Sequence, residues 1–342
     1  MPTSPTLFIQ IPCYNEAETL PVALADLPRE LPGVARVVWL VVDDGSTDDT
    51  VAVAKAHGVD HVVRHTRNMG LAKAFMTGLN ACLELGADII VNTDADNQYD
   101  AACIPDLLAP ILEGRADMVV GARPIDQVEH FSPLKKRLQK FGSWVLRKVS
   151  GTEVQDAPSG FRALTRRAAM RLNVFSEYTY TLETIIQAGQ ARLAVVSVPV
   201  RVNGKLRPSR LMSSMVSYLR KSLATVLRIS ITYRPLRFFL NAAWVFFILG
   251  GVLCLRWLAL YFLGTDRAHV PSLILATILL SGGFFCAVLA VLGDLLAVNR
   301  KLLEDVRYRL MRLELDHKRD AGPDADAEPD AGEAASKEPG DA

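Results

Sequence analysis

Two aspartates directly after an apolar segment are the strongest chemical signal in the sequence. Asp94 and Asp96 follow the run DIIVN of residues 88–92, and Asn92, Asn97 and Gln98 stand close to them. Carboxylate and amide oxygens are the ligands that Mg²⁺ and Mn²⁺ take while bridging to substrate phosphates. An isolated Asp-x-Asp pair is also typical of a turn held by side-chain hydrogen bonds. The pair therefore needs support from other residues before it indicates a metal site.

Two more polar clusters follow apolar runs nearer the N-terminus. Tyr14, Asn15 and Glu16 come after LFIQIP, and Asp43-Asp44-Gly45-Ser46 comes at the end of VVWLVVDD. In open parallel sheets, ligands bind outside the carboxyl ends of the strands. Three polar clusters at one sheet edge outline a cleft for a nucleotide and a metal. The sequence has neither GxGxxG nor GxxxxGK[ST], so dehydrogenase and P-loop ATPase functions lose their main support.

The elements that must position these clusters are short strands and helices in alternation. The expected strands are LFIQIP, VVWLVVDD, HVVRH, DIIVNTD and MVVGA. Helical patterns lie between them, from about Glu16, after Ser46, from Gly70 and over residues 104–112. This alternation predicts an α/β fold with a doubly wound, mostly parallel sheet.

The C-terminal third contains two apolar runs of membrane-spanning length. Residues 238–255 and 271–293 contain no formal charge, and about 20 apolar residues cross a bilayer as a helix. Basic residues precede the first run and follow the second, which places both long ends in the cytoplasm. The N-terminus lacks a basic region before its short apolar run, so we read it as a first strand rather than a signal peptide. We therefore expect an integral protein of the inner (cytoplasmic) membrane with a helical hairpin.

The net charge of +1 combines a basic body with an acidic tail. Residues 131–149, FSPLKKRLQKFGSWVLRKV, form a basic amphipathic pattern that fits either a solvated helix face or a membrane-surface helix. The C-terminal tail is rich in Ala, Asp, Glu and Pro, and its low apolar content predicts disorder. The five cysteines are far apart without a CxxC pair, so neither a disulfide framework nor a zinc site is indicated.

The sequence resembles the family 2 glycosyltransferases with the GT-A fold. The matching segments are IPCYNE, VVDDGSTDDT, RNMGLAKAFMTG, NTDADNQY, VVGAR and DAPSGFRAL, in this order. Within that family the chain is similar to the branch that contains dolichol-phosphate mannose synthase and the bacterial polyprenyl-phosphate glycosyltransferases, the latter often ending in a two-helix membrane hairpin. The resemblance covers roughly residues 7–210.

The resemblance implies roles for the matched residues. Those that would line the nucleotide pocket are Pro12, Tyr14, Asn15, Glu16, Asp44 and Asp94. Mg²⁺ or Mn²⁺ would be held on the donor diphosphate by Asp94, Asp96 and Gln98. Arg123 stands where the branch places an arginine for the acceptor phosphate, and the basic run of residues 135–137 would add to that site. We accordingly take Asp96, Arg123 and Arg137 as the catalytic residues. Asp156, Ser159 and Arg162 are open between a structural role and a supporting role, and Glu183 between a structural and an acceptor-side role.

The implied reaction moves one sugar from a nucleotide sugar to a polyprenyl phosphate such as undecaprenyl phosphate, with inversion, for a cell-envelope glycan or lipid modification. The resemblance favours a UDP-sugar donor. Partners are then the donor, the lipid acceptor and the bilayer, with no nucleic acid, and a homo-oligomer is left open. One alternative is a processive polysaccharide synthase, although Arg256-Trp257 is preceded by Leu253 where such enzymes carry a glutamine. Another is a catalytically idle membrane scaffold.

The expected domain organisation follows from these segments. Residues 1–210 form the cytoplasmic catalytic domain, and residues 211–235 a juxtamembrane amphipathic helix. Two membrane spans cover residues 236–263 and 270–298. A cytoplasmic basic helix over residues 299–318 and a disordered acidic tail over residues 319–342 complete the chain.

Overall fold

The structure is a computed structural model that describes residues 4–124, 147, 150–174, 180–204, 228, 231–263 and 270–321. Its elements, in chain order, are β1 (Thr6–Cys13), α1 (Leu20–Asp26), β2 (Arg36–Asp43), α2 (Thr50–Ala56), β3 (His61–Arg64), α3 (Leu71–Glu84), β4 (Ile89–Asn92), η1 (Ala101–Cys103), α4 (Ile104–Leu112), β5 (Met118–Ala122), β6 (Arg162–Thr165), α6 (Arg166–Arg171), α7 (Thr181–Gln190), β7 (Val195–Pro199), α9 (Pro235–Phe262) and α10 (Val270–Ala321). The expected basic helix of residues 131–149 lies outside the described residues apart from Arg147. Most of the 211–235 segment and the acidic tail from residue 322 lie outside them as well.

The globular part is built on a seven-stranded sheet of order β3-β2-β1-β4-β6-β5-β7. All five strands expected from the sequence form, and β1, β2, β3 and β4 pair in parallel. β6 is antiparallel to both of its neighbours, β4 and β5, while β7 lies parallel to β5. The sheet is therefore mostly parallel, as expected, with one reversed strand inserted beside β4.

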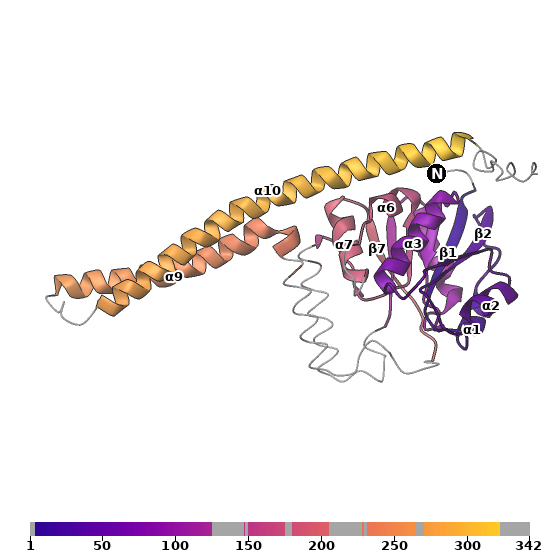
Figure 1. The fold of residues 1–342 in the computed structure, drawn as a ribbon, viewed down its shortest axis with the longest axis horizontal. Helices are drawn as coiled ribbons and strands as arrows, with labels where there is room; N and C mark the ends of the chain where they lie inside the picture. Colours follow the sequence, from indigo (N-terminus) through magenta and orange to yellow (C-terminus); the bar gives the residue numbers. More distant parts are fainter. Residues whose placement is uncertain are drawn as a thin grey trace, which may run out of the picture.

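Helices cover both faces of this sheet (Figure 1). Alternate residues of β1 supply the two cores: Leu7 and Ile9 face a cluster with α1 and α4, whereas Phe8 faces a cluster with α3, α6 and α7. Burial on both faces explains why β1 and β2 read as nearly continuous apolar runs rather than as alternating ones. The functional clusters are thus positioned by a rigid three-layer body.

A hairpin of two long helices, α9 and α10, projects from the globular part (Figure 1). Both are long and apolar enough to cross a membrane, and only 11% and 17% of their most apolar windows are buried. This exposure distinguishes them from the core helices of a soluble protein. The helices approach closely at glycines: a methyl group added to Gly250 would lie 2.9 Å from Leu280, and one on Gly283 would lie 2.9 Å from Phe247.

Helix α10 continues past the apolar span without a break. The expected span of residues 270–298 and the basic helix of residues 299–318 are one helix, because residues 294–321 contain neither glycine nor proline to end it. Its C-terminal part lies along the globular domain, where Leu315 is buried and Tyr308 and Met311 pack on the core. The hairpin and the domain are therefore joined by a rigid helix as well as by the chain that precedes α9.

Candidate active site

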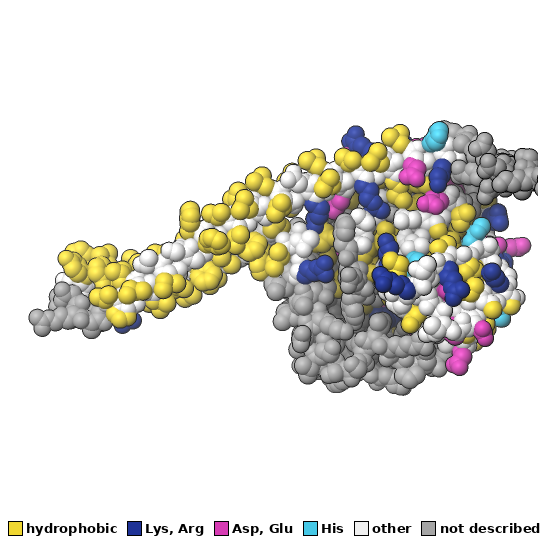
Figure 2. All heavy atoms as spheres, in the orientation of Figure 1, with side chains coloured by type: hydrophobic (Ala, Val, Ile, Leu, Met, Phe, Trp, Pro, Cys, Tyr) yellow, Lys and Arg dark blue, Asp and Glu magenta, His cyan; other side chains and the backbone are white. Residues whose placement is uncertain are grey.

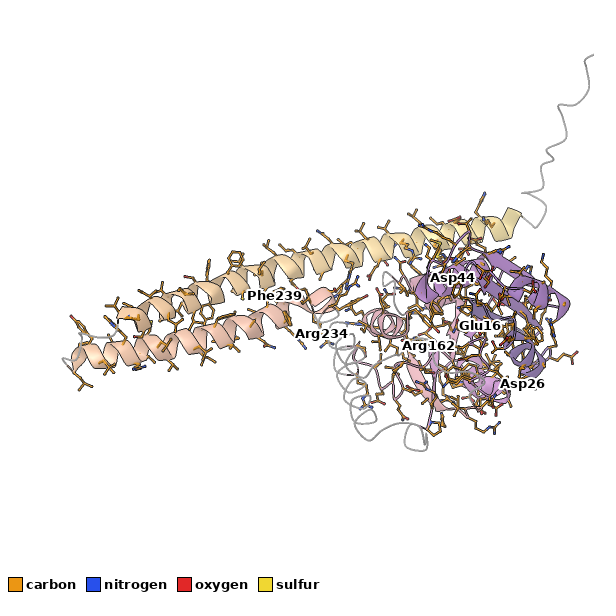
Figure 3. All side chains as sticks on the ribbon, turned by 60° about the horizontal axis from the view of Figure 1, so that its bottom comes forward. Glu16, Asp26, Asp44, Arg162, Arg234 and Phe239 are labelled. Atoms are coloured by element: carbon orange, nitrogen blue, oxygen red, sulfur yellow. The ribbon has the colours of Figure 1, made fainter. Side chains whose placement is uncertain are left out.

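The three polar clusters lie at one edge of the sheet because β1, β2 and β4 run parallel and end together. β1 ends at Cys13, which pairs with Asp43 at the end of β2, and β4 ends at Asn92. The following loops, residues 14–19, 44–49 and 93–100, therefore share the carboxyl edge, where open parallel sheets bind ligands. Glu16, Asp44 and Arg162 all lie in the globular part, whereas Arg234 and Phe239 mark the start of the hairpin (Figure 3).

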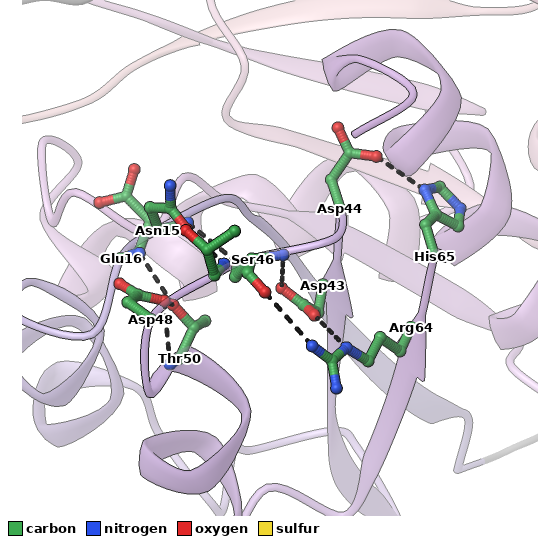
Figure 4. Close-up of polar contacts among 10 residues, drawn as sticks. Asn15, Glu16, Asp43, Asp44, Ser46, Asp48, Thr50, Arg64 and His65 are labelled. Atoms are coloured by element: carbon green, nitrogen blue, oxygen red, sulfur yellow. Dashed lines mark hydrogen bonds and ion pairs between the residues drawn. The ribbon is translucent and has the colours of Figure 1, made fainter. Parts of the chain in front are cut away.

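The loop after β1 is tied to the loop after β2 by side-chain hydrogen bonds (Figure 4). The Asn15 N–H donates to Ser46 Oγ at 2.9 Å, and Asn15 Oδ1 accepts from the Thr47 N–H at 2.8 Å. The Glu16 N–H donates to Thr50 Oγ1 at 2.9 Å. Asn15 has a φ of 53°, a left-handed conformation that asparagine tolerates better than most residues. These bonds fix the predicted nucleotide-binding loop as one unit.

The aspartate pair at the end of β2 is satisfied internally. Asp43 accepts from the Ser46 N–H and pairs with Arg64 at 3.0 Å. The Asp44 carboxylate accepts from the backbone N–H groups of residues 69 and 70, both at 2.8 Å, and lies 2.7 Å from His65 Nδ1. Asp44 is only 3% exposed. Its carboxylate therefore holds the 64–70 loop in place, and its role toward a nucleotide stays a prediction.

The aspartates after β4 have a different environment. Asp94 is half-buried, and none of the described residues donates a hydrogen bond to its carboxyl group. Burial and the nearby Asp96 carboxylate raise the pKa of Asp94 to about 7, although Arg123 and Arg162 oppose the rise. Asp96 accepts one hydrogen bond, from the Gln98 N–H at 3.2 Å. Asp94 is thus a carboxyl group whose ionised form still needs a positive partner.

Gly160 lets the Asp94 carboxyl group approach the loop before β6. A methyl group added there would lie 3.1 Å from each Asp94 carboxyl oxygen and 2.8 Å from the Tyr180 hydroxyl. Any other residue at position 160 would push against these groups. The motif DAPSGFRAL therefore forms one wall around Asp94.

Arg123 enters the same region from the end of β5. Its Nε and Nη2 atoms donate to the Asp156 carboxylate at 2.6 and 3.1 Å. Asp156 is fully buried, and the Arg123 side chain is 15% exposed. A bidentate pair of this kind fixes the plane of the guanidinium, and Nη1 makes no hydrogen bond with the described residues. Arg123 is therefore a cation held in a fixed orientation with one amino group to spare.

A buried network of hydrogen bonds holds the residues around Asp94 in place. The Asn92 amide accepts from Gln10 Nε2 at 2.9 Å and donates to the Gly160 carbonyl and the Tyr180 hydroxyl at 2.8 and 2.9 Å. The Gly160 N–H donates to the Tyr99 hydroxyl at 3.0 Å. Asn92 was expected to offer an oxygen to the cleft, but this is wrong, because its Oδ1 atom is buried and bound to Gln10.

Arg162 is the most unusual member of this network because it is fully buried without a direct carboxylate partner among the residues that the structure describes. Its guanidinium donates to the carbonyls of Ser159 and Ala157 at 2.8 and 2.9 Å and to Thr184 Oγ1 at 2.5 Å. Burial lowers the pKa of Arg162 to about 10, so the group stays charged at neutral pH. Asp156, Ser159 and Arg162 are thus buried residues that support the wall of the site.

The structure brings most of the predicted site residues together, although Arg137 lies outside the described residues. Four further residues of the network, Gln10, Tyr99, Tyr180 and Thr184, could not be singled out from the sequence because single polar residues of this kind have no distinctive spacing. Glu183, which was left open, accepts from the Tyr233 hydroxyl at 3.2 Å where α7 meets the hairpin. Tyr233 and Glu183 thus join the domain to the start of the hairpin.

The residues at this edge fit a divalent cation in the region of Asp94 and Asp96. No cluster of three or more carboxylate, histidine or cysteine groups exists within the described ranges. Mg²⁺ and Mn²⁺ are commonly held by one or two carboxylates plus substrate phosphates, so such a cluster is not required. A carboxyl group with a raised pKa and no donor is the group that such a cation would ionise.

Comparison with known proteins gives a consistent result. The model of the protein family Glycosyl transferase family 2 matches residues 8–172 of the chain. The chain is 30% identical over 217 residues to the undecaprenyl-phosphate mannosyltransferase of Micrococcus luteus, covering 60% of this chain and 87% of that protein. It is also 30% identical over 220 residues to the UDP-N-acetylglucosamine--dolichyl-phosphate N-acetylglucosaminyltransferase of Methanococcus voltae, covering 57% of this chain and 84% of that one.

A solved structure with a similar fold is glucosyl-3-phosphoglycerate synthase from Mycobacterium tuberculosis, in complex with Mn²⁺, UDP and glucosyl-3-phosphoglycerate. The TM-score is 0.51 at 21% identity, over 67% of this chain and 80% of that one. At this identity the likeness shows the fold alone, and it confirms the expected GT-A architecture.

Proposed function

The chain belongs to glycosyl transferase family 2, and on that premise we propose that it transfers one sugar from a nucleotide sugar to a polyprenyl phosphate. The proposed donor is a UDP-sugar and the proposed acceptor is a lipid such as undecaprenyl phosphate. Both relatives, one bacterial and one archaeal, are named as transferases that act on a polyprenyl phosphate. The product would be a polyprenyl-phosphate sugar for cell-envelope glycans or lipid modification.

One observation carries this proposal: an under-partnered carboxyl group and a fixed arginine lie in one buried region. The Asp94 carboxyl group receives no hydrogen bond from the described residues, while Arg123 is locked against Asp156 with its Nη1 group left over. A site that handles two anions needs a cation-binding group for the leaving diphosphate and a separate positive charge for the acceptor phosphate. Asp94 and Asp96 supply the cation-binding group, and Arg123 supplies the separate positive charge.

The chain's own residues then have defined tasks. Asp94, Asp96 and Gln98 would hold Mg²⁺ or Mn²⁺, which would supply positive charge to the leaving nucleoside diphosphate. Arg123 binds the acceptor phosphate and orients one of its oxygens toward the anomeric carbon. A phosphate monoester has a second pKa of about 6, so this oxygen is already anionic at neutral pH and needs little help from a general base. An in-line attack inverts the configuration at that carbon.

The hairpin would hold this chemistry at a bilayer. We propose that α9 and the first part of α10 cross the inner membrane and that the globular domain and both chain ends lie in the cytoplasm. The acceptor's phosphate lies at the membrane surface, and the hairpin begins at Arg234 beside the globular part. The expected basic helix of residues 131–149, with Arg137, would add positive charge at the same surface.

The test is nucleoside diphosphate release by the detergent-purified full chain with Mn²⁺ or Mg²⁺. A panel of UDP- and GDP-sugars is assayed with and without undecaprenyl phosphate, and products are sized by mass spectrometry. Lipid-dependent release with one sugar per lipid is the expected result. If no donor responds to the lipid, the acceptor half of the proposal is wrong. A polymeric product would indicate the processive synthase, and failure to bind any nucleotide sugar would indicate the scaffold.

A further inference from the structure

A stripe of exposed apolar side chains runs along the part of α10 that lies beside the globular domain. Its members are Leu303, Val306, Leu310 and Leu313, which are 52–70% exposed. Figure 2 shows hydrophobic side chains continuing along α10 from the hairpin over the globular part. Four large apolar residues on one exposed helix face are more than the scattered single residues that need no explanation. The stripe therefore calls for a partner.

This stripe lies outside the span that would cross the membrane. The side of the same helix segment that faces away from the stripe contacts the globular domain, where Arg171 lies 4.2 Å above the Tyr308 ring. Arg307, which lies beside the stripe, donates to the Leu172 carbonyl at 2.9 Å. Because α10 is uninterrupted, it carries the stripe away from the bilayer over about 15 Å instead of along its surface. In the proposed membrane insertion, the stripe would therefore point away from the lipid surface.

The spacing of the stripe fits a second helix. Residues 303, 306, 310 and 313 follow the 3-4-3 pattern of a coiled-coil seam, with 303 and 310 at a positions and 306 and 313 at d positions. The same register runs back into the span through Leu296 and Leu292, both more than half exposed, with the polar Asn299 at the d position between Leu296 and Leu303. A partner helix would therefore meet an apolar seam with one polar position.

We propose that the stripe pairs with the same stripe of a second copy of this chain, as a parallel two-helix coiled coil. Two copies inserted in one membrane have the same direction, so their α10 helices meet in parallel and in register. The parallel direction depends on the proposed membrane insertion but not on the proposed sugar transfer. A two-fold axis along the seam makes the contact self-complementary.

The charges beside the seam favour this pairing. In the register above, Arg309 occupies a g position and Glu314 the following e position, which face each other across a parallel coiled coil. The Arg309 side chain is 76% exposed, and its ion pair with Asp305 lies within the same helix. Glu314 forms no ion pair with the described part of the chain. Two Arg309–Glu314 contacts, one on each side of the axis, would form between the copies.

The stripe forms part of one wall of a cleft between α10 and α3. Leu303, Val306 and Leu310 line this cleft from α10, and Asn80 and Glu84 line it from α3. Tyr308 and Leu315, which contact the core of the domain, lie on a different side of the helix, whereas Met311 packs on the core and also lines the cleft. The two globular domains would therefore lie on opposite sides of the paired helices.

Site-directed cross-linking of the full chain in native membranes tests the pairing. Cys254 and Cys286 are replaced by serine, and the other three cysteines are buried in the globular domain. In this background Leu310→Cys is compared with Arg312→Cys, whose side chain is 65% exposed but lies away from the seam. We expect disulfide-linked dimers at position 310 to exceed those at position 312 by at least tenfold, and Leu303→Cys to repeat the result one heptad earlier. Equal cross-linking at 310 and 312, or none at 303 and 310, would overturn the proposal.

Charge exchange tests the register independently. Arg309→Glu should reduce cross-linking at position 310 several-fold, because it places two glutamates opposite each other, and adding Glu314→Arg should restore it. No restoration in the double variant would contradict the parallel, in-register arrangement.

Light scattering of detergent-purified protein gives the third readout. We expect a dimer for the wild type and a monomer for Leu303→Asp/Leu310→Asp, whose exposed positions should tolerate the change without unfolding. A monomeric wild type that cross-links nowhere would overturn the proposal. Quenching by brominated lipid of a bimane label on the Leu310→Cys variant would assign the stripe to lipid and overturn it as well.

Discussion

The two halves of the candidate site contain similar residues in opposite electrostatic situations. In the half formed by β1 and β2, the Asp44 carboxylate is surrounded by two backbone N–H groups and His65. In the half formed by β4 and β6, the Asp94 carboxyl group has no donor among the described residues and a pKa raised to about 7. A carboxylate that is already satisfied stabilises the fold, whereas one that is not is available to a cation. The same kind of side chain therefore serves the scaffold in one half and, in the proposed function, binds a cation in the other.

The largest expected effect comes from removing a carboxylate in the second half. Asp96→Ala should lower turnover by about 10³-fold, because the proposed cation site loses one of its two carboxylates. The melting temperature should change little, since Asp96 accepts only one local hydrogen bond. Steady-state assays and thermal unfolding measure the two effects. The matched control is Asp49→Ala, at an exposed position in the first half, which should keep activity within about twofold. Near-normal activity of Asp96→Ala would show that the assignment of the cation site is wrong.

Removing the fixed cation should separate the two substrates. Arg123→Ala should raise the KM for the lipid phosphate by about 30-fold, the value of one charge-assisted hydrogen bond, while the Kd for the nucleotide changes much less. Lipid titrations and calorimetry with UDP measure these constants. The control is Arg201→Ala, which removes an exposed arginine paired with Asp100 and should have little effect on either. An equal loss of both affinities would place Arg123 in another subsite.

In the first half, removing a carboxylate should lower the stability of the fold instead of the turnover. Asp44→Asn keeps one oxygen acceptor and replaces the other by an N–H₂ group, which then faces the N–H of either residue 69 or residue 70. We expect a loss of about 2–3 kcal/mol, or roughly 5–10 °C in Tm. Thermal unfolding followed by circular dichroism measures it, with Asp49→Asn as the exposed control. An unchanged Tm would mean that the Asp44 carboxylate is not part of the scaffold.

The smallest expected effect is a gain in stability, and it depends on pH. The pKa of Asp94 is raised, so between about pH 4 and pH 7 the folded form keeps a proton that the unfolded form releases, and stability falls as pH rises through this window. Asp94→Asn has no such proton. In EDTA the variant should therefore match the wild type near pH 4.5 and exceed it by about 1–2 kcal/mol at pH 8. Thermal unfolding at both pH values tests this. A variant that is less stable than the wild type at pH 8 would contradict the environment described for Asp94.

Much of the fold could be predicted because its signals are local. The strands β1 to β5 are short apolar runs bounded by turn residues, and the hairpin helices are long apolar runs, so each is read from neighbouring residues. The reversed strand β6 could not be read in this way. Its sequence, RALT, is short and lacks periodicity, and its place between β4 and β5 depends on pairing with segments more than 40 residues away.

The site was predicted as a set of residues but not as a set of environments. The resemblance to known glycosyltransferases pointed to Asp94, Asp96 and Arg123, and the structure gathers the surrounding residues at one sheet edge. It could not indicate that Asn92 is buried against Gln10 or that Asp156 holds Arg123, because these contacts join residues 82 and 33 positions apart. Hydrogen bonds between residues this far apart in the sequence depend on the packing of whole helices and strands.

The amino-acid sequence by itself determined the alternation of strands and helices, the apolar hairpin and the identity of the acidic clusters, since these depend on residue type and local spacing. Only the tertiary structure decided which carboxylate is satisfied and which is not. Asp44 and Asp94 look alike as residues that follow a strand, but the donors for Asp44 come from the 65–70 loop, and the wall around Asp94 comes from the loop before β6. The order of strands in the sheet sets these neighbours, and the neighbours set which hydrogen bonds each carboxyl group can accept.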